Sequence, residues 1–258
     1  MAVTDETHAS ADDDRAVGRM SLVEHLAELR KRLLITLIAV AATTIVAWIF
    51  YNHIITFMLQ PYHGYLHTHH QKDISNGNLI ITGPLEGFTT RLKISIYTGI
   101  ALATPILLHQ TWRFITPALH KNERRYLLPF LTAGIALFTL GATTAILVFP
   151  KALTWLINAS GTGIVPLFTP TRYLTFYAAM VVITGATFTY PLVIVLLELT
   201  GTIPTTTWRH WRRQAIVILC LTAAVITPSN DPFSFLAMAI PMLILYETAI
   251  LTGRALHK

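Results

Sequence analysis

Long blocks of apolar residues, separated by short polar and basic segments, divide this chain from end to end. A helix needs about 20 mostly apolar residues to cross the roughly 30 Å hydrocarbon core of a bilayer. Only 12% of the residues are charged, against about a quarter in a soluble domain. We therefore expect an all-α membrane protein. The predicted spans lie at about Leu33–Tyr51, Ile94–Ile115, Tyr126–Phe149, Tyr173–Leu199, Ala215–Thr227 and Phe233–Leu251.

The last two of these six transmembrane helices are short, and a turn from Pro228 to Pro232 joins them. We expect a helical hairpin that does not reach fully across, with local thinning of the bilayer. Proline kinks helices, so the prolines in and beside the spans predict a concave, bowed arrangement. The alternative is that they reflect the ordinary composition of membrane helices. These prolines are Pro105, Pro129, Pro150, Pro191 and Pro241.

Lysine and arginine are distributed unequally between the two sides of the predicted spans, and cytoplasmic loops carry the excess in membrane proteins. One side takes Arg15, Arg19, Arg30, Lys31, Arg32, Arg113, Lys121, Arg124, Arg125, Arg209, Arg212, Arg213, Arg254 and Lys258. The other takes Lys72, Arg91, Lys93, Lys151 and Arg172. We therefore expect both termini to be cytoplasmic, with residues 1–20 a disordered acidic tail and 21–258 one six-helix transmembrane domain. The polar start of the chain does not resemble a secretory signal peptide.

Several classes of function are disfavoured. The net charge of +6 could suggest nucleic acid, but the basic residues cluster beside apolar ends, as in membrane proteins. The predicted spans carry no nucleophile–base set, so we expect no enzyme, and no phosphate-binding loop is present. We expect no cofactor. Histidines cluster in a predicted polar, hairpin-like loop after the first span, without nearby cysteine or well-spaced carboxylates, so we expect no metal. They are His63, His67, His69 and His70.

The segment from Ser21 to Leu33 is the first informative motif. Ser21 and Glu24 have the spacing of a capping box, which predicts a helix start. The segment's leucines recur at helical spacing and give one apolar face. Glu28 lies four residues before Arg32, a favourable spacing for an ion pair. An interfacial helix whose basic end merely anchors the first span would have the same pattern.

The second motif runs from Gln110 to Arg125, across the predicted first cytoplasmic loop. Glu123 lies at the expected start of the third span, where a carboxylate interacts favourably with the helix dipole. Basic residues surround it in the sequence. A salt-bridged glutamate with no further role would fit the same pattern.

At these two motifs the chain resembles the TatC family. The family pattern His-Leu-x-Glu-Leu-Arg-x-Arg is similar to His25 to Arg32, and Trp-x-Phe-x-x-Pro-Ala-Leu-x-x-x-Glu-Arg-Arg is similar to Trp112 to Arg125. Thr227 to Phe233 resembles the family's last periplasmic turn, and Ala239 to Glu247 its sixth span. The resemblance covers about residues 21–255.

The resemblance implies a receptor for twin-arginine signal peptides in the cytoplasmic membrane, the core scaffold of a translocase that exports folded proteins with the proton-motive force. Glu28 and Glu123 would accept the paired arginines, because a carboxylate matches the planar guanidinium with two parallel hydrogen bonds. The other residues expected at this surface are Leu29, Arg30, Phe114, Pro117, Leu119, Arg124 and Arg125. Arg124 and Arg125 would repel a cationic peptide, so the two glutamates must point away from them.

The implied partners are TatA- and TatB-like single-span proteins, further copies of the chain in the assembled complex, and phospholipid. Glu247, Thr189 and Asp231 are expected where partner helices dock. Many family members carry Glu or Gln at the place of Thr189, and a hydroxyl cannot carry charge. For Glu198 we favour snorkelling to the membrane surface. The alternative function is a small-solute or ion transporter, which expects ionisable residues near the membrane midplane and an internal repeat; no repeat is visible.

Overall fold

The computed structural model describes residues 22–68, 79–115, 127–159, 161, 168–199, 205–226 and 232–256. The described residues form helices and connecting turns, without a strand. The helices are α2 (Leu22–Ile49), α3 (Tyr51–Thr68), α4 (Glu86–Ile115), α5 (Leu127–Ala159), α6 (Pro170–Phe188), α7 (Tyr190–Leu199), α8 (Thr205–His210), α9 (Arg212–Ile226) and α10 (Pro232–Leu256). The prediction of an all-α protein is confirmed.

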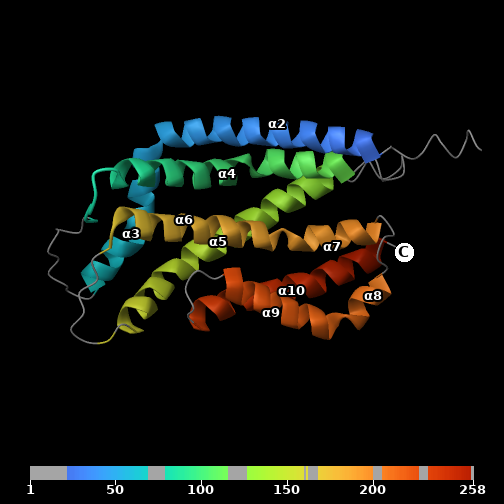
Figure 1. Ribbon diagram of the computed structural model, residues 1–258. Helices are drawn as coiled ribbons and strands as arrows, with labels where there is room; N and C mark the ends of the chain where they lie inside the picture. Colours follow the sequence, from blue (N-terminus) through green and yellow to red (C-terminus); the bar gives the residue numbers. More distant parts are fainter. Residues whose placement is uncertain are drawn as a thin grey trace, which may run out of the picture.

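The long helices run between two ends of an elongated molecule (Figure 1). Helix α2 packs along α4, α5 crosses obliquely and packs on α6, and α10 packs on α7 and α9. The start of α2, the end of α4, α8 and the end of α10 lie together at one end (Figure 1). We call this the α8 end. Helix α3 and the end of α5 lie at the opposite, α3 end (Figure 1).

Within the described residues, four helical segments are long and apolar enough to cross a membrane: Leu26–Ile49, Glu86–Phe114, Leu128–Ala159 and Pro170–Glu198. Helix α9 has 15 residues, which agrees with the predicted short fifth span. Helix α10 has 25 residues, so it is longer than the short sixth span predicted from the sequence. A count of six membrane crossings stays a prediction, as do the concave shape and the orientation of the termini.

Helices α2 and α4 approach closely because α4 carries a glycine at the crossing. A Cβ added to Gly99 would lie only 2.8 Å from the backbone nitrogen and Cα of Thr44. The Thr43 hydroxyl donates a hydrogen bond to the Gly99 carbonyl at 2.8 Å. Small residues that let backbones approach are typical of helix contacts in membranes.

The segment after α2 is helical, so the prediction of a polar loop there is wrong. Helix α3 contains Pro61 and Gly64, which disfavour a helix in isolation. Met58, Tyr62 and Tyr65 nevertheless lie at helical spacing and are buried. Burial of this face against α5 and α6 therefore outweighs the local propensities.

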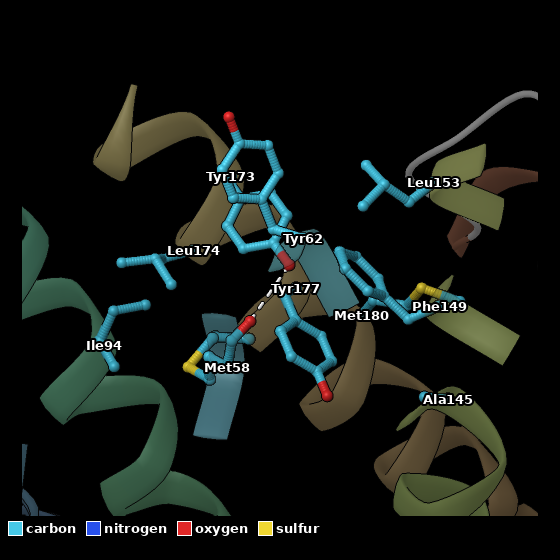
Figure 2. Close-up of a cluster of buried hydrophobic side chains, with 11 residues drawn as sticks. Met58, Tyr62, Ile94, Ala145, Phe149, Leu153, Tyr173, Leu174, Tyr177 and Met180 are labelled. Atoms are coloured by element: carbon cyan, nitrogen blue, oxygen red, sulfur yellow. Dashed lines mark hydrogen bonds between the residues drawn. The ribbon is translucent and has the colours of Figure 1, made fainter. Parts of the chain in front are cut away.

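An aromatic cluster joins α3 to α5 and α6 at the α3 end (Figure 2). The rings of Phe149 and Tyr177 stack with centroids 4.1 Å apart, and Tyr62 contacts Tyr173 at 5.7 Å. The Tyr173 hydroxyl donates to the Met58 carbonyl at 3.1 Å (Figure 2). A buried tyrosine usually finds such a partner, and here the bond ties α6 to α3.

The predicted fourth span is divided into α6 and α7 at Thr189. The Thr189 amide and hydroxyl both donate to the Ala186 carbonyl, at 3.1 and 2.7 Å. Pro191 follows and has no amide hydrogen to continue the helix. The helix is therefore interrupted beside the proline singled out in the sequence, and the Thr189 side chain closes the first of the two helices.

Candidate functional site

Glu28 and Arg32 form an ion pair on α2. Arg32 Nη2 donates to Glu28 Oε1 at 2.7 Å, as the four-residue spacing predicted. The two side chains are only 16% and 15% exposed, respectively. Glu28 Oε2 is buried and makes no hydrogen bond in the part of the chain that the structure describes. One carboxylate oxygen of Glu28 therefore keeps its capacity to accept a hydrogen bond.

Arg32 also links α2 to α4. Its Nη1 donates to Gln110 Oε1 at 3.3 Å, and Gln110 lies five residues before the end of α4 at Ile115. The guanidinium therefore holds Glu28 and the end of α4 together. Gln110 opens the second sequence motif, but sequence reasoning gave it no role. A polar residue inside an apolar helix, close to its basic end, was the available signal.

The segment between α4 and α5 begins and ends beside this pair. The ring of Trp112, near the end of α4, lies 4.6 Å from that of Phe130, near the start of α5. The end of α4 and the start of α5 therefore lie side by side, at the same end of the molecule as Glu28. Glu123, Pro117, Leu119, Arg124 and Arg125 lie outside the described residues.

The other residues expected at this surface have different exposures. Leu29 and Arg30 are exposed on α2, and Phe114 is half-buried near the end of α4. The structure thus brings Glu28, Gln110 and Phe114 to one end of the molecule, with Leu29 and Arg30 exposed beside them. At this end of the molecule, a carboxylate with one oxygen that makes no hydrogen bond among the described residues, that of Glu28, lies one residue before the exposed Leu29.

A second ion pair lies at the α8 end, between α9 and α10. Arg212 Nη2 donates to Glu247 Oε2 at 2.6 Å, with side chains 43% and 47% exposed. The adjacent Tyr246 hydroxyl donates to the Trp208 carbonyl of α8 at 2.8 Å. Trp208 Nε1 and Arg212 Nε are buried and make no hydrogen bond among the described residues. The sequence had singled out Glu247 without its partner, because Arg212 is 35 residues away.

Glu198 is enclosed by protein, so the expectation that it snorkels to the surface is wrong. Its side chain is 1% exposed near the end of α7. It interacts electrostatically with Tyr246 of α10. The packing of α10 on α7 covers it, and the sequence of α7 alone contains no sign of that neighbour.

Thr189 and Asp231 are the other two residues expected at partner contacts, besides Glu247. Thr189 is half-buried and uses its hydroxyl for the end of α6, so it shares no hydrogen bond with Glu247. Asp231 lies outside the described residues, one position before α10. The three residues expected at partner contacts are thus not brought together as one described site.

The histidine cluster is divided. His63 is exposed on α3, while His69 and His70 lie outside the described residues, and so does the side chain of His67. Among the described residues, no group of three or more histidine, cysteine, aspartate or glutamate side chains is placed to hold a metal ion.

The chain is similar to known proteins over nearly all of the described helices. The family described as "Sec-independent protein translocase protein (TatC)" matches residues 24–241. The TatC protein of Frankia casuarinae is 39% identical over 240 residues, which cover 92% of this chain and 66% of the relative. That of Aquifex aeolicus is 35% identical, covering 91% of this chain and 95% of the relative.

Some relatives are longer than this chain. It spans 66% of the Frankia casuarinae protein and 61% of that from Corynebacterium kroppenstedtii, which is 36% identical. The fold has solved counterparts. A crystal structure of the twin-arginine translocase receptor TatC, determined in DDM, superimposes with a TM-score of 0.73 at 35% identity. The match covers 89% of this chain and 99% of that one. This chain belongs to the TatC family of Sec-independent protein translocase proteins.

Proposed function

We propose that the chain is the receptor for twin-arginine signal peptides and the core scaffold of a Tat translocase in the cytoplasmic membrane. It exports folded proteins with the proton-motive force and carries out no covalent chemistry of its own. The observation that supports this most directly is the half-used carboxylate of Glu28, beside the two ends of the segment that carries Glu123.

Glu28 suits a guanidinium ligand for a physical reason. A buried acceptor without a donor raises the free energy of the protein by about 1–3 kcal/mol. A peptide arginine that donates to Oε2 removes this cost and adds a charge-assisted hydrogen bond. Because Oε2 is covered, the peptide must first move neighbouring groups. Because Arg32 occupies Oε1, a fully bidentate contact also requires Arg32 to shift.

The second arginine of the peptide is assigned to Glu123. Glu123 belongs to the segment that joins the end of α4, where Gln110 binds Arg32, to the start of α5, and we assign it to the same peptide on this ground. Leu29, Arg30, Phe114, Pro117 and Leu119 complete the surface. Arg124 and Arg125 must point away from the bound arginines.

The remaining assignments rest on family membership and on the sequence. Both termini are cytoplasmic in this proposal, which the excess of basic residues at the α8 end supports. TatA- and TatB-like single-span proteins dock at the α9 and α10 side, near Glu247, with Thr189 and Asp231 as further contacts. Several copies of the chain assemble in the active complex.

We do not adopt a small-solute transporter as the function. That alternative requires ionisable groups near the membrane midplane. Glu198 instead lies near the end of α7, and Glu247 is paired with Arg212 at the same end of the molecule.

The binding step is tested with the full chain in lipid nanodiscs and a fluorescent twin-arginine signal peptide. We expect Glu28→Ala and Glu123→Ala each to weaken binding about 10- to 100-fold, the range for loss of one charge-assisted hydrogen bond. Glu28→Gln preserves the shape and removes the charge, so it should lose nearly as much.

Two controls accompany this measurement. A peptide with lysines in place of both arginines should bind weakly to the unaltered protein, because lysine cannot copy the guanidinium fork. Glu247→Ala should bind the peptide normally. Unchanged peptide affinity in the double variant of Glu28 and Glu123 would refute the receptor assignment.

A further inference from the structure

Two cavities adjoin at the α3 end. The larger, about 770 Å³, lies between α3 and α5. The smaller, about 390 Å³, extends between α3, α4 and α6. Phe57, Ile146 and Tyr177 line both cavities, so the two spaces meet at these side chains. We call the combined space the α3 groove.

The two halves of the α3 groove differ in chemistry. The larger cavity is lined by Gln60, Lys151, Thr154 and Asn158 in addition to apolar side chains. The smaller is lined almost wholly by apolar side chains, including Ile54, Met58, Ala101 and Val182. Among the described residues that line either cavity there is a lysine and no aspartate or glutamate. The groove therefore favours an amphiphile with a negative polar head.

The polar half lies at the depth of lipid headgroups. Helix α5 has 33 residues and is therefore about 50 Å long, well beyond the roughly 30 Å hydrocarbon core. Lys151 lies two turns before its end at Ala159. Trp155, which is 41% exposed, lies one turn beyond Lys151. Tryptophan and lysine near the end of a spanning helix mark the membrane–water interface.

We propose that the α3 groove is a binding site for an anionic phospholipid. The headgroup phosphate lies by Lys151, Gln60 and Asn158, and one acyl chain passes Tyr177 into the apolar half, toward Ala101 and Val182. The inference does not depend on the proposed receptor function, because the groove lies at the end of the molecule opposite Glu28.

A signal-peptide segment is the competing occupant, and charge argues against it. The receptor proposal places the peptide's arginines at Glu28, at the α8 end, and the apolar part of such a peptide brings no negative group to Lys151. A phospholipid has a negative headgroup, which matches Lys151 in the larger cavity, and apolar acyl chains, which match the apolar lining of the smaller cavity.

We expect that a substitution at Gly64 can block the α3 groove without destabilising the fold. Gly64 lines the larger cavity, and a Cβ added there meets no atom within 4 Å. We therefore expect Gly64→Leu to place its side chain in the groove, and it replaces a poor helix former inside α3. Lys151→Gln removes the charge and leaves the groove open. Lys93→Gln is the matched control, because Lys93 is exposed on α4 near the same end and does not line either cavity.

The measurement is native mass spectrometry of the delipidated full-length protein, titrated with phosphatidylglycerol or with zwitterionic phosphatidylcholine of the same chains. We expect the unaltered protein to prefer phosphatidylglycerol. Lys151→Gln should lower that preference about fivefold, the effect of one lysine near a charged headgroup. Gly64→Leu should weaken binding of both lipids, while Lys93→Gln and Glu28→Ala should bind as the unaltered protein does.

Three results would overturn the proposal. The first is equal binding of the two lipids by the unaltered protein. The second is the same loss of preference in Lys93→Gln as in Lys151→Gln. The third is crosslinking of a twin-arginine signal peptide to a photoreactive residue at position 64, which would assign the groove to the peptide instead.

Discussion

Helices α2 and α9 are both edge helices, and they are attached in different ways. Each packs mainly on one neighbour, α2 on α4 and α9 on α10. Each also exposes a row of large apolar side chains, including Leu37, Ile38 and Ile45 on α2 and Val217, Leu221 and Val225 on α9. Exposed apolar rows are expected on helices that face lipid or another helix.

Helix α2 is fixed along its whole length. Arg32 binds Gln110 near one end, and Gly99 lets the backbones meet in the middle. At the other end the guanidinium of Arg91 donates to the Trp48 carbonyl at 3.1 Å and lies 4.5 Å from the Trp48 ring centroid. These attachments keep Glu28 in a constant position relative to the end of α4.

Helix α9 has fewer polar attachments. The pair of Arg212 and Glu247 joins it to α10 at the α8 end, and both side chains are nearly half exposed. Among the described side chains of α9, only Leu219 and Ala223 are buried in the cluster with α10. The difference fits the two proposed roles, in which α2 holds the proposed peptide-binding carboxylate in place and α9 leaves a face open for a partner helix. Variants of the two attachments test this difference.

The largest effect is expected at Gly99. In Gly99→Leu the added Cβ would meet Thr44 backbone atoms at 2.8 Å, so α2 must move away from α4. Overpacking of this kind costs about 1–3 kcal/mol, and the loss of the bond from Thr43 adds to it. We expect the melting temperature in detergent to fall by about 6–12 °C and peptide binding to be lost.

Gly64→Leu is the matched control for this substitution, because its added side chain enters open space. It should melt at or above the temperature of the unaltered protein. If Gly99→Leu melts with the unaltered protein too, α2 is not held by its close backbone contact, and the distinction between the two edge helices fails.

The next effect is expected from Arg32→Gln. This change leaves the largely buried Glu28 without its internal partner and removes the charged donor to Gln110. A buried acceptor that loses its donor costs about 1–3 kcal/mol, so the melting temperature should fall by about 4–8 °C. Arg30→Gln, at an exposed position on the same helix, should change it by less than about 2 °C.

The two attachments also differ in how far the sequence predicted them. The pair of Glu28 and Arg32 was predictable because a four-residue spacing on a helix brings side chains together without any tertiary information. The start of the helix was predicted from another local pattern, the capping-box spacing of Ser21 and Glu24, and the helix begins at Leu22. The pair of Arg212 and Glu247 depends on how α9 folds back on α10, which no local pattern specifies.

Tertiary packing also explains the two predictions that failed. A polar, hairpin-like loop with several histidines was expected after the first span, but the buried face of Met58, Tyr62 and Tyr65 makes α3 a helix. Glu198 was expected to reach the membrane surface, but the packing of α10 on α7 encloses it. In both cases a neighbour distant in the sequence decides the outcome. The assignment of Glu123 stays a prediction.

A smaller effect is expected from Tyr246→Phe. The hydroxyl bond to the Trp208 carbonyl at 2.8 Å joins α10 to the short helix α8. Its loss should cost about 1 kcal/mol, mostly by loosening α8. Hydrogen exchange of the amides at 205–210 should therefore accelerate, while exchange in α2 stays constant. Equal acceleration in both helices would mean that α2 and the α8–α10 region open as one unit.

The smallest effect is expected at the pair of Arg212 and Glu247. An ion pair this exposed contributes about 0–1 kcal/mol and weakens further as salt screens it. In a double-variant cycle of Arg212→Gln and Glu247→Gln, thermal unfolding should give a coupling below about 1 kcal/mol that decreases in high salt. A coupling above about 2 kcal/mol, unaffected by salt, would mean that this pair stabilises the contact of α9 with α10 as strongly as Arg32 stabilises the contact of α2 with α4. Helix α9 would then be as firmly fixed as α2, and its exposed face could not adjust to a partner helix.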